Sequence, residues 1–571
     1  MSTWISFLVA TVSWIAAFWF LVICEGVYLD FADGIAHFSI SNNALTDTAL
    51  FFDSWARPMH VLLSVLPAQF GYAPYILIHV VLTIATLYVS LELGRHWGLP
   101  LLWLVPWWIS LNRAVAYVTM AGLTETLFMF IVMLSFLGLE RKRWRFTACL
   151  LGASLYARPE ALWLVVLGVS WMFAKNPQWN WWKIIGYVLL VPISMNLIEW
   201  SLGFGSNAMA FSAFSGSSLN IYGSGGWDHF FYNRVKWAST PMLLGVAIST
   251  VVLLVRAIRG QMHLVSLVLV YAWGVFVAHT VLWHLGLMGS LGLTRIMAIV
   301  VPALALIIHS AAGSPRWTHI LLVLLFIAHI AQLIYRDALR FERSPQQILA
   351  ENVASWIKTN AVNSDLAVQW RLPLFIAGLP SDEIEQTRKL WSLPPLKPSS
   401  GITAGTVLIW DNVTGFREGG IDKEILDHDA NLELVHAVNY LTLEARIYRK
   451  KKEVPLEFQL KSIAPWLTGS GVWERAEGYA LRLRTPQKNG RIIGIQPSDK
   501  SVLLSWHGDS TGTVVLKFAD GTKTELGSTG SFQVEPLMNE AMVLWRAERG
   551  EVLHQFNAVY GQPPIAEGAS Y

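Results

Sequence analysis

The sequence predicts a polytopic α-helical membrane protein of about eleven spans, followed by an extracytoplasmic region of mixed α/β and then all-β structure. The chain of 571 residues is 54% hydrophobic and only 14% charged, whereas soluble domains are about a quarter charged. The charge is also unevenly placed, since residues 1–335 hold 16 Lys/Arg and 11 Asp/Glu and residues 336–571 hold the other 26 and 28. An apolar part is therefore joined to a soluble part, which excludes a wholly soluble enzyme and a disordered chain.

Eleven apolar runs are candidates for membrane spans, because crossing the bilayer requires about 30 Å of hydrocarbon-compatible helix. The first run, Thr3–Cys24, has no Lys or Arg before it and is too long for a cleavable signal, so we interpret it as a retained span. The runs are 3–24, 74–93, 98–112, 121–139, 146–157, 160–175, 183–203, 240–257, 262–284, 295–313 and 317–335.

The basic residues predict the orientation of these spans. With the N-terminus inside, ten Lys/Arg lie in inner loops and six in outer loops, and the cluster at 141–145 lies inside. Lys175 and Lys183 lie on the inner side as well only if the chain crosses the membrane twice between residues 146 and 175. We therefore predict that 146–157 and 160–175 form a hairpin with Arg158-Pro159-Glu160 at its outer tip. One long span, broken at this tripeptide, is the alternative. An odd total places the C-terminal part outside the inner (plasma) membrane, in the periplasm or an equivalent lumen.

Three domains are predicted from these shifts in composition: residues 1–335 in the membrane, 336–450 as a mixed α/β domain and 451–571 as a β-sandwich-like domain. The second domain combines helix signals, such as Pro345–Lys358, with short strand-like runs. The third shows alternating apolar residues and the hairpin dipeptide Asp520-Gly521, both typical of antiparallel sheets.

The first outer loop contains the strongest candidates for catalysis. Asp30, Asp33 and His37 lie within eight residues, directly beyond the first span, and Asp33 and His37 share a face if the segment is helical. A carboxylate beside a low-dielectric wall can act as a base on a hydroxyl group. The second carboxylate or the histidine can orient an acceptor or hold a metal ion. A solvated acidic loop at the membrane interface is the alternative.

Other charged residues are candidates because they occur in or beside apolar segments. Arg57 and His60 begin an amphipathic segment and can hold a phosphate group; snorkelling to the interface is the alternative. Charges at membrane depth are costly and face a cavity or one another, so we expect one cavity open to the outer leaflet. An ion pair between Glu125 and Arg158 that only holds the bundle is the alternative. The residues at that depth are Glu125, Arg158, Glu160 and Arg295. Lone histidines, including His79 and His279, are interpreted as packing or interfacial residues.

The order of these features resembles the C superfamily of membrane glycosyltransferases (GT-C), most closely the bacterial relatives of lipid-dependent mannosyltransferases. The resemblance covers roughly residues 1–335. It rests on the acidic loop with Asp33 and His37, the segment Trp55–His60, the pair Thr124-Glu125, the turn Arg158–Glu160, and Arg295 before Pro302. The chain departs from several family members in lacking an adjacent acidic pair, because Asp30 and Asp33 are three residues apart.

This resemblance implies an enzyme that moves a sugar, a hexose such as mannose, from a polyprenyl-phosphate donor to a glycan, lipid or protein hydroxyl at the outer face, with inversion. The catalytic aspartate carries over onto Asp33, with Asp30 as its competitor. Arg295 is the first candidate for the donor phosphate, ahead of Arg57, His60 and Arg158. Substrate binding falls to His37, Glu125 and Glu160.

Whether this predicted site uses a divalent cation, Mg or Mn, as a cofactor stays open at this point. The net charge of +3 gives no indication of a nucleic-acid partner. Two other functional classes stay open at this point: a flippase or transporter of lipid-linked sugars, which would use the same cavity without bond cleavage, and a non-catalytic assembly or receptor subunit that binds through its β domain.

Overall fold

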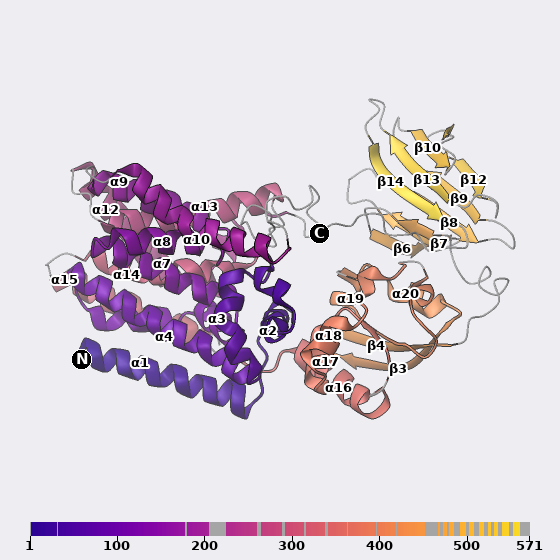
Figure 1. The fold of residues 1–571 in the computed structure, drawn as a ribbon, viewed down its shortest axis with the longest axis horizontal. Helices are drawn as coiled ribbons and strands as arrows, with labels where there is room; N and C mark the ends of the chain where they lie inside the picture. The colour runs from indigo at the N-terminus through magenta and orange to yellow at the C-terminus, as the bar shows by residue number, and fades with distance from the viewer. Residues whose placement is uncertain are drawn as a thin grey trace. The chain divides into compact units, whose positions relative to one another are not determined.

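The computed structural model describes two compact units, Met1–Ser344 and Pro345–Ser570, which are drawn in Figure 1. Residues 2–451 are described except for 31, 177–179, 205–223, 260–263, 288–291, 313–315, 337–340, 362–363, 395–396 and 418. Beyond residue 451, the structure describes the backbone of ten strands between 466 and 559.

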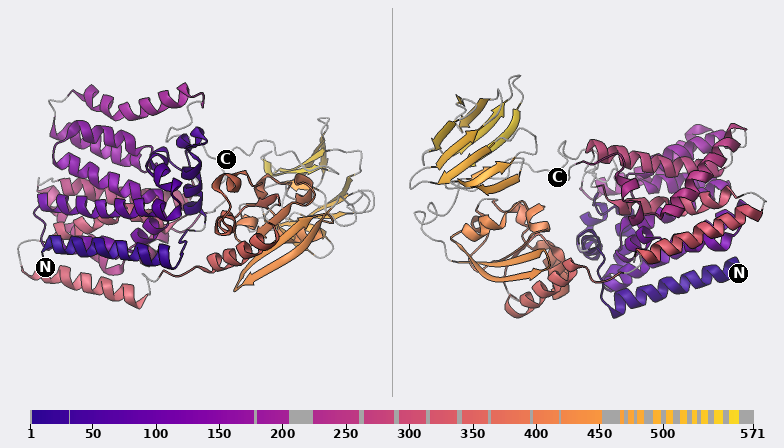
Figure 2. Two further views of the ribbon diagram at one scale, coloured as in Figure 1. Left: turned by 60° about the horizontal axis from the view of Figure 1, so that its bottom comes forward. Right: turned by 180° about the vertical axis from the view of Figure 1, so that it is seen from behind.

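The first unit is a bundle of helices that run side by side (Figures 1 and 2). Its helices are α1 (Thr3–Phe18, continued by a π-helical turn Trp19–Cys24), α2 (Asp33–Asn43), α3 (Pro58–Gln69), α4 (Tyr72–His96), α5 (Val105–Ser110), α6 (Arg113–Met120), α7 (Thr124–Glu140), α8 (Trp144–Ser154), α9 (Ala161–Lys175), α10 (Trp181–Ser201), α11 (His229–Tyr232), α12 (Thr240–Ile258), α13 (Leu264–Leu285), α14 (Val301–Ser310) and α15 (Arg316–Tyr335). The 3₁₀ helix η6, Thr294–Val300, leads directly into α14.

The helices make this a multi-pass membrane protein, but the structure does not confirm the predicted count of eleven spans. In the described part of the chain, six helices are long and apolar enough to cross a membrane, or seven if α6 and α7, bent by 117°, count as one span. Shorter apolar helices such as α9, with 15 residues, extend only about 22 Å at 1.5 Å per residue. An apolar run buried inside the bundle therefore has the same composition as a complete span.

Two glycines allow the first outer segment to pack closely on the bundle. Gly122, at φ +69°, forms the turn between α6 and α7, and a Cβ there would lie 2.4 Å from Tyr75. Gly34, in the first turn of α2, lies against the same turn, because its Cβ would be 2.4 Å from the backbone oxygen of Ala121. The close approach brings the start of α2 to the start of α7, where Glu125 lies.

The predicted break at Arg158-Pro159-Glu160 separates two helices, α8 and α9, which both the hairpin and the broken-span interpretation require. The stretch 204–236, whose Ser and Gly content favours a long loop, lies mostly outside the described residues. The helix predicted at Pro345–Lys358 coincides with α16 (Pro345–Asn360).

The second unit begins with a four-stranded mixed sheet in the order β1-β2-β4-β3. Strands β1 (Leu366–Val368) and β2 (Val407–Asp411) are parallel, whereas β4 (Leu443–Lys450) is antiparallel to both β2 and β3 (Leu432–Tyr440). Helices α16, α17 (Arg371–Ala377), α18 (Ser381–Gln386), α19 (Thr414–Arg417) and α20 (Lys423–His428) accompany it. Apolar side chains, including Leu408, Trp410 and Tyr448, form its core.

The remaining strands form two five-stranded sheets, in the orders β11-β10-β13-β14-β5 and β12-β9-β8-β7-β6. The strands are β5 (Trp466–Thr468), β6 (Val472–Ala476), β7 (Tyr479–Arg484), β8 (Ile492–Pro497), β9 (Val502–His507), β10 (Thr513–Phe518), β11 (Lys523–Leu526), β12 (Gly530–Val534), β13 (Glu540–Arg546) and β14 (Val552–Val559). The packing of these sheets as a sandwich stays a prediction, and Asp520-Gly521 lies outside the described residues.

Candidate active site

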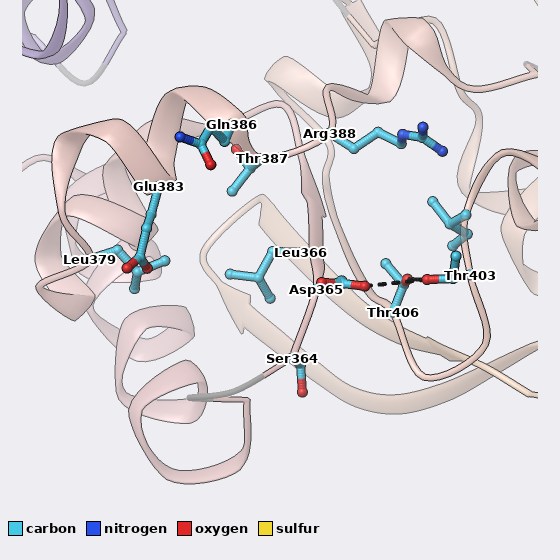
Figure 3. Close-up of a pocket in the computed structure, with 11 residues that line it drawn as sticks. Ser364, Asp365, Leu366, Leu379, Glu383, Gln386, Thr387, Arg388, Thr403 and Thr406 are labelled. Atoms are coloured by element: carbon cyan, nitrogen blue, oxygen red, sulfur yellow. Dashed lines mark hydrogen bonds between the residues drawn. The ribbon is translucent and has the colours of Figure 1, made fainter. Parts of the chain in front are cut away.

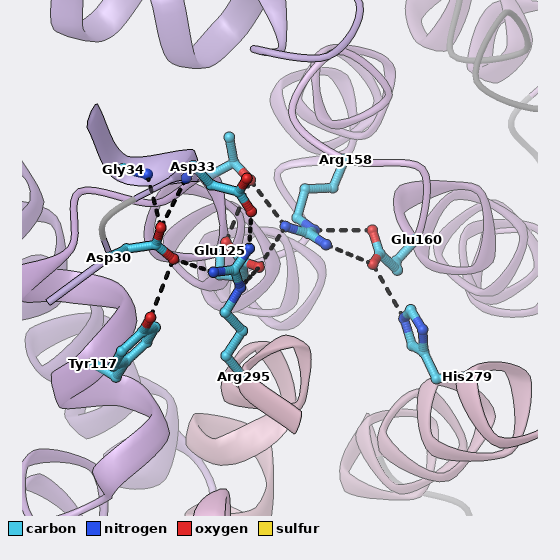
Figure 4. Close-up of polar contacts among 10 residues, drawn as sticks. Asp30, Asp33, Gly34, Tyr117, Glu125, Arg158, Glu160, His279 and Arg295 are labelled. Atoms are coloured by element: carbon cyan, nitrogen blue, oxygen red, sulfur yellow. Dashed lines mark hydrogen bonds and ion pairs between the residues drawn. The ribbon is translucent and has the colours of Figure 1, made fainter. Parts of the chain in front are cut away.

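Charged side chains from five distant segments meet in one cluster within the first unit, shown in Figure 4. They come from the segment before α2, the start of α2, the start of α7, the connection between α8 and α9, and η6. We call this the charged cluster; its members are Asp30, Asp33, Glu125, Arg158, Glu160 and Arg295. All six were predicted site residues, and the structure brings them together.

Asp30 is buried and forms hydrogen bonds through both of its carboxylate oxygens. Oδ1 accepts from the backbone N–H groups of Ala32, Asp33 and Gly34 at 3.0, 2.8 and 3.3 Å. Oδ2 accepts from the Tyr117 hydroxyl at 3.1 Å and from the guanidinium of Arg295. The Asp30 carboxylate therefore satisfies the unpaired N–H groups at the start of α2 in the manner of a helix cap.

Asp33 differs from Asp30 in exposure and in the number of its partners. Its side chain is 35% exposed, against 5% for Asp30, and its carboxylate accepts from Nη2 of Arg295. Burial raises the pKa of the Asp33 carboxyl, and Arg295 opposes that effect. Of the two carboxylates, Asp33 is the one that an approaching molecule can reach.

Arg295 is shared between carboxylates. Its two terminal nitrogens contact Asp30 and Asp33, and its Nε lies 4.0 Å from Glu125 Oε1. That Nε is buried and has no hydrogen-bond acceptor in the described part of the chain. The guanidinium thus retains its Nε–H as an unused donor, whereas its two terminal nitrogens face the carboxylates of Asp30 and Asp33.

Arg158 links the other half of the charged cluster. It lies 2.9 Å from Glu125 and from the Thr124 hydroxyl, and its Nε and Nη2 donate to the two oxygens of Glu160 at 3.0 and 2.9 Å. Although burial lowers the pKa of Arg158, Glu125 and Glu160 raise it above its usual value. His279 Nε2, on α13, lies 3.1 Å from Glu160. The ion pair between Glu125 and Arg158, considered above as the alternative, does form, and it belongs to a larger network.

Arg57 lies near the charged cluster without belonging to its ion pairs. Burial lowers its pKa to about 10, and the positive charge of Arg158 contributes. Its Nη1 donates to the Ser54 carbonyl at 2.7 Å, and no carboxylate lies within ion-pair distance of it among the described residues. Its φ of +69° is an uncommon conformation for a residue with a side chain. This unpaired guanidinium is available to an anion.

His37 and His60 form a separate aromatic group. The His37 ring stacks on Trp55 at a centroid distance of 4.4 Å and lies 5.1 Å from the His60 ring. Burial lowers the pKa of His60 to about 4 and holds that of His37 well below its usual value, so both rings are neutral near pH 7. Each histidine is thus poorly suited to bind phosphate as a cation.

Three residues of the network were not predicted as site residues: Tyr117, Thr124 and His279. His279, interpreted from the sequence as a packing or interfacial residue, contacts Glu160. A single histidine in a long apolar helix gives no indication of its partner, which lies 119 residues earlier in the chain. Tyr117 likewise lies 87 residues from Asp30.

A divalent cation does not fit the charged cluster as it is arranged. Asp30 and Asp33 both direct carboxylate oxygens at Arg295. No group of three or more His, Cys, Asp or Glu side chains has the arrangement to hold a metal ion within the residues that the structure covers.

The second unit contains a pocket of about 400 Å³ beside the starts of β1 and β2 (Figure 3). Asp365, Thr403 and Thr406 line it, and the Thr403 hydroxyl lies 3.3 Å from Asp365 and 3.0 Å from Thr406. None of the predicted site residues lies there.

Comparison with solved structures shows likeness in fold. The apo structure of ArnT from Cupriavidus metallidurans aligns over 78% of this chain and 98% of its own length, with 12% identity and a TM-score of 0.52. ArnT bound to undecaprenyl phosphate aligns over 77% and 97% with 12% identity and a TM-score of 0.49. The arabinofuranosyltransferase AftD from Mycobacteria aligns over 97% of this chain and 61% of its own, with 11% identity and a TM-score of 0.46.

No family model matches the chain, and no curated protein sequence is significantly similar to it. The likeness to the apo structure of ArnT is a likeness in fold.

Proposed function

We propose that this protein transfers a sugar from a polyprenyl-phosphate donor to an acceptor hydroxyl, with inversion at the anomeric carbon. The observation that carries the proposal is the partly exposed Asp33 carboxylate, held against Arg295 in a buried cluster of charges. The fold of ArnT supports it, because ArnT has also been solved in complex with undecaprenyl phosphate.

Asp33 is the proposed base. It would accept the proton of the acceptor hydroxyl while that oxygen attacks the anomeric carbon from the face opposite the phosphate. The bond between the anomeric carbon and the phosphate oxygen breaks, and its electron pair stays on the departing polyprenyl phosphate. Asp30 is a positioning residue in this scheme, because its oxygens already accept from three backbone N–H groups, Tyr117 and Arg295.

Arg295 and Arg57 are the proposed contacts of the donor phosphate. Arg57 has a guanidinium without a carboxylate partner among the described residues, and Arg295 has an unused buried N–H. Each donor that meets the developing negative charge could contribute about 3–4 kcal/mol, by analogy with oxyanion sites. Arg158 is a weaker candidate than predicted, because Glu125 and Glu160 already occupy it. Glu125 and Glu160 would act on the substrate through Arg158, which they hold. His37 would act on it through the ring of Trp55, on which it stacks.

The donor sugar is proposed to be a hexose, with mannose as the first to test. The acceptor would be a glycan, lipid or protein at the outer face of the inner membrane, with the C-terminal unit on that same side.

Purified full-length protein in nanodiscs, supplied with a polyprenyl-phosphate hexose and candidate acceptors, tests the proposal. We expect release of polyprenyl phosphate with formation of a glycosylated acceptor, and loss of both in Asp33→Asn. Full activity of that variant would remove Asp33 from the role of base. Movement of the intact lipid-linked sugar across vesicles, without bond cleavage, would instead identify a flippase.

A further inference from the structure

The charged cluster carries more negative than positive charge, although the proposed donor is itself an anion. It holds four carboxylates, Asp30, Asp33, Glu125 and Glu160, against the two guanidiniums of Arg158 and Arg295. Arg57 adds a third cation nearby. A phosphate group that binds Arg158 or Arg295 therefore competes with a carboxylate that already contacts that guanidinium.

Of the contacts in the cluster, the one between Asp33 and Arg295 is the most readily exchanged. Asp30 has four other hydrogen bonds that hold it in place when Arg295 moves. Glu125 and Glu160 are held by Arg158 in a buried environment. Asp33 is the most exposed of the four carboxylates, so water can solvate it when the guanidinium leaves.

The same contact opposes the proposed role of Asp33. A carboxylate paired with a guanidinium has a lowered affinity for a proton, and the oxygen that faces Arg295 is not free to meet an acceptor hydroxyl. Loss of the Arg295 contact would therefore raise the proton affinity of Asp33 and strengthen it as a base.

From these contacts we propose that Arg295 couples donor binding to activation of the base. The donor phosphate takes the place of Asp33 on Nη2 of Arg295, and Asp33 is released as a free carboxylate only when a donor is present. This inference rests on the proposed function and adds a regulatory step to the same site. It also accounts for an aspartate that is both the most exposed carboxylate of the cluster and held by an arginine.

The coupling makes an unusual prediction about affinity: removing the charge of the proposed base strengthens the binding of the phosphate. Asp33 and the phosphate compete for one guanidinium, so Asp33→Asn should bind undecaprenyl phosphate about 5- to 20-fold more tightly than the unaltered protein, within the usual range of coupling between two sites. Asp33→Ser should change the affinity in the same direction, and thermal unfolding of each variant reports whether it is folded.

A double-mutant cycle separates competition for Arg295 from general repulsion. Binding of undecaprenyl phosphate is measured in nanodiscs for the unaltered protein, Asp33→Asn, Arg295→Gln and the double variant. We expect the gain from Asp33→Asn to fall at least threefold in the Arg295→Gln background. Glu160→Gln serves as a charge control, since it removes one negative charge from the same cluster without a contact to Arg295, and any gain that it gives should persist in the Arg295→Gln background.

A gain from Asp33→Asn that is equally large in the Arg295→Gln background would overturn the coupling in favour of simple repulsion. If the unaltered protein binds the lipid phosphate and transfers sugar, but neither Asp33 variant binds more tightly, the coupling fails and the proposed function stands. If the unaltered protein does not bind undecaprenyl phosphate at all, both fail together.

Discussion

Replacing Gly34 with alanine tests whether the charged cluster depends on the close approach of α2 to the turn between α6 and α7. The new Cβ would lie 2.4 Å from the Ala121 backbone oxygen and 3.3 Å from the Asp30 Cβ. A backbone oxygen cannot rotate away as the end of a flexible side chain can. The start of α2 must therefore move by about 1 Å to restore an ordinary van der Waals distance, which overpacks the site at a cost of about 1–3 kcal/mol.

This displacement acts on both aspartates, because Gly34 follows Asp33 and donates its N–H to Asp30. A misplacement of about 1 Å can reduce a catalytic rate by about 100-fold. We expect Gly34→Ala to lower transfer by that factor and to lower the melting temperature of the purified protein in detergent.

Gly186→Ala is the matched control for this substitution. Gly186 lies within α10, and a Cβ there would meet nothing within 4 Å, so the same change should leave transfer and melting temperature unaltered, or raise the latter slightly. Gly34→Ala with normal activity and a normal melting temperature would refute the packing argument. Equal losses in both variants would attribute the effect to helical alanine in general.

Three further outcomes are expected. Arg57→Ala should raise the KM for the lipid donor at least tenfold and leave the acceptor KM unchanged, because its unpaired guanidinium is proposed to contact the phosphate; equal changes in both values would contradict that assignment. Tyr117→Phe removes one hydrogen bond from Asp30 and should lower the free energy of unfolding by about 1 kcal/mol, measured by denaturation in detergent, whereas an unchanged midpoint would show that the bond contributes nothing. Burial lowers the pKa of Lys389 in the second unit to about 8, so the unfolded chain binds this proton more tightly than the folded chain does. The contribution of Lys389 to the free energy of unfolding should therefore rise with pH from about 8 to the ordinary lysine pKa near 10.4. Lys389→Met should abolish this rise.

Each candidate residue in the charged cluster was identifiable from the sequence, because charge is rare in apolar segments and is conspicuous there. Glu125, Arg158 and Arg295 stand out for that reason alone. The break between α8 and α9 was also predictable, since the Arg-Pro-Glu turn interrupts an apolar run. The number of complete spans was not, because composition does not distinguish a short helix buried in the bundle from one that crosses the bilayer.

Residue composition and spacing alone indicated an apolar helical part, a charge-rich part, and the acidic first loop with its two aspartates. The folded chain was needed to show that Arg295 contacts an aspartate 265 residues earlier, that Asp30 caps α2 while Asp33 stays accessible, and that His279 joins the network through Glu160. The physical reason is that residue type and local spacing report how each segment is solvated, whereas the choice of partner depends on which helices pack together and how closely glycines such as Gly34 allow them to approach.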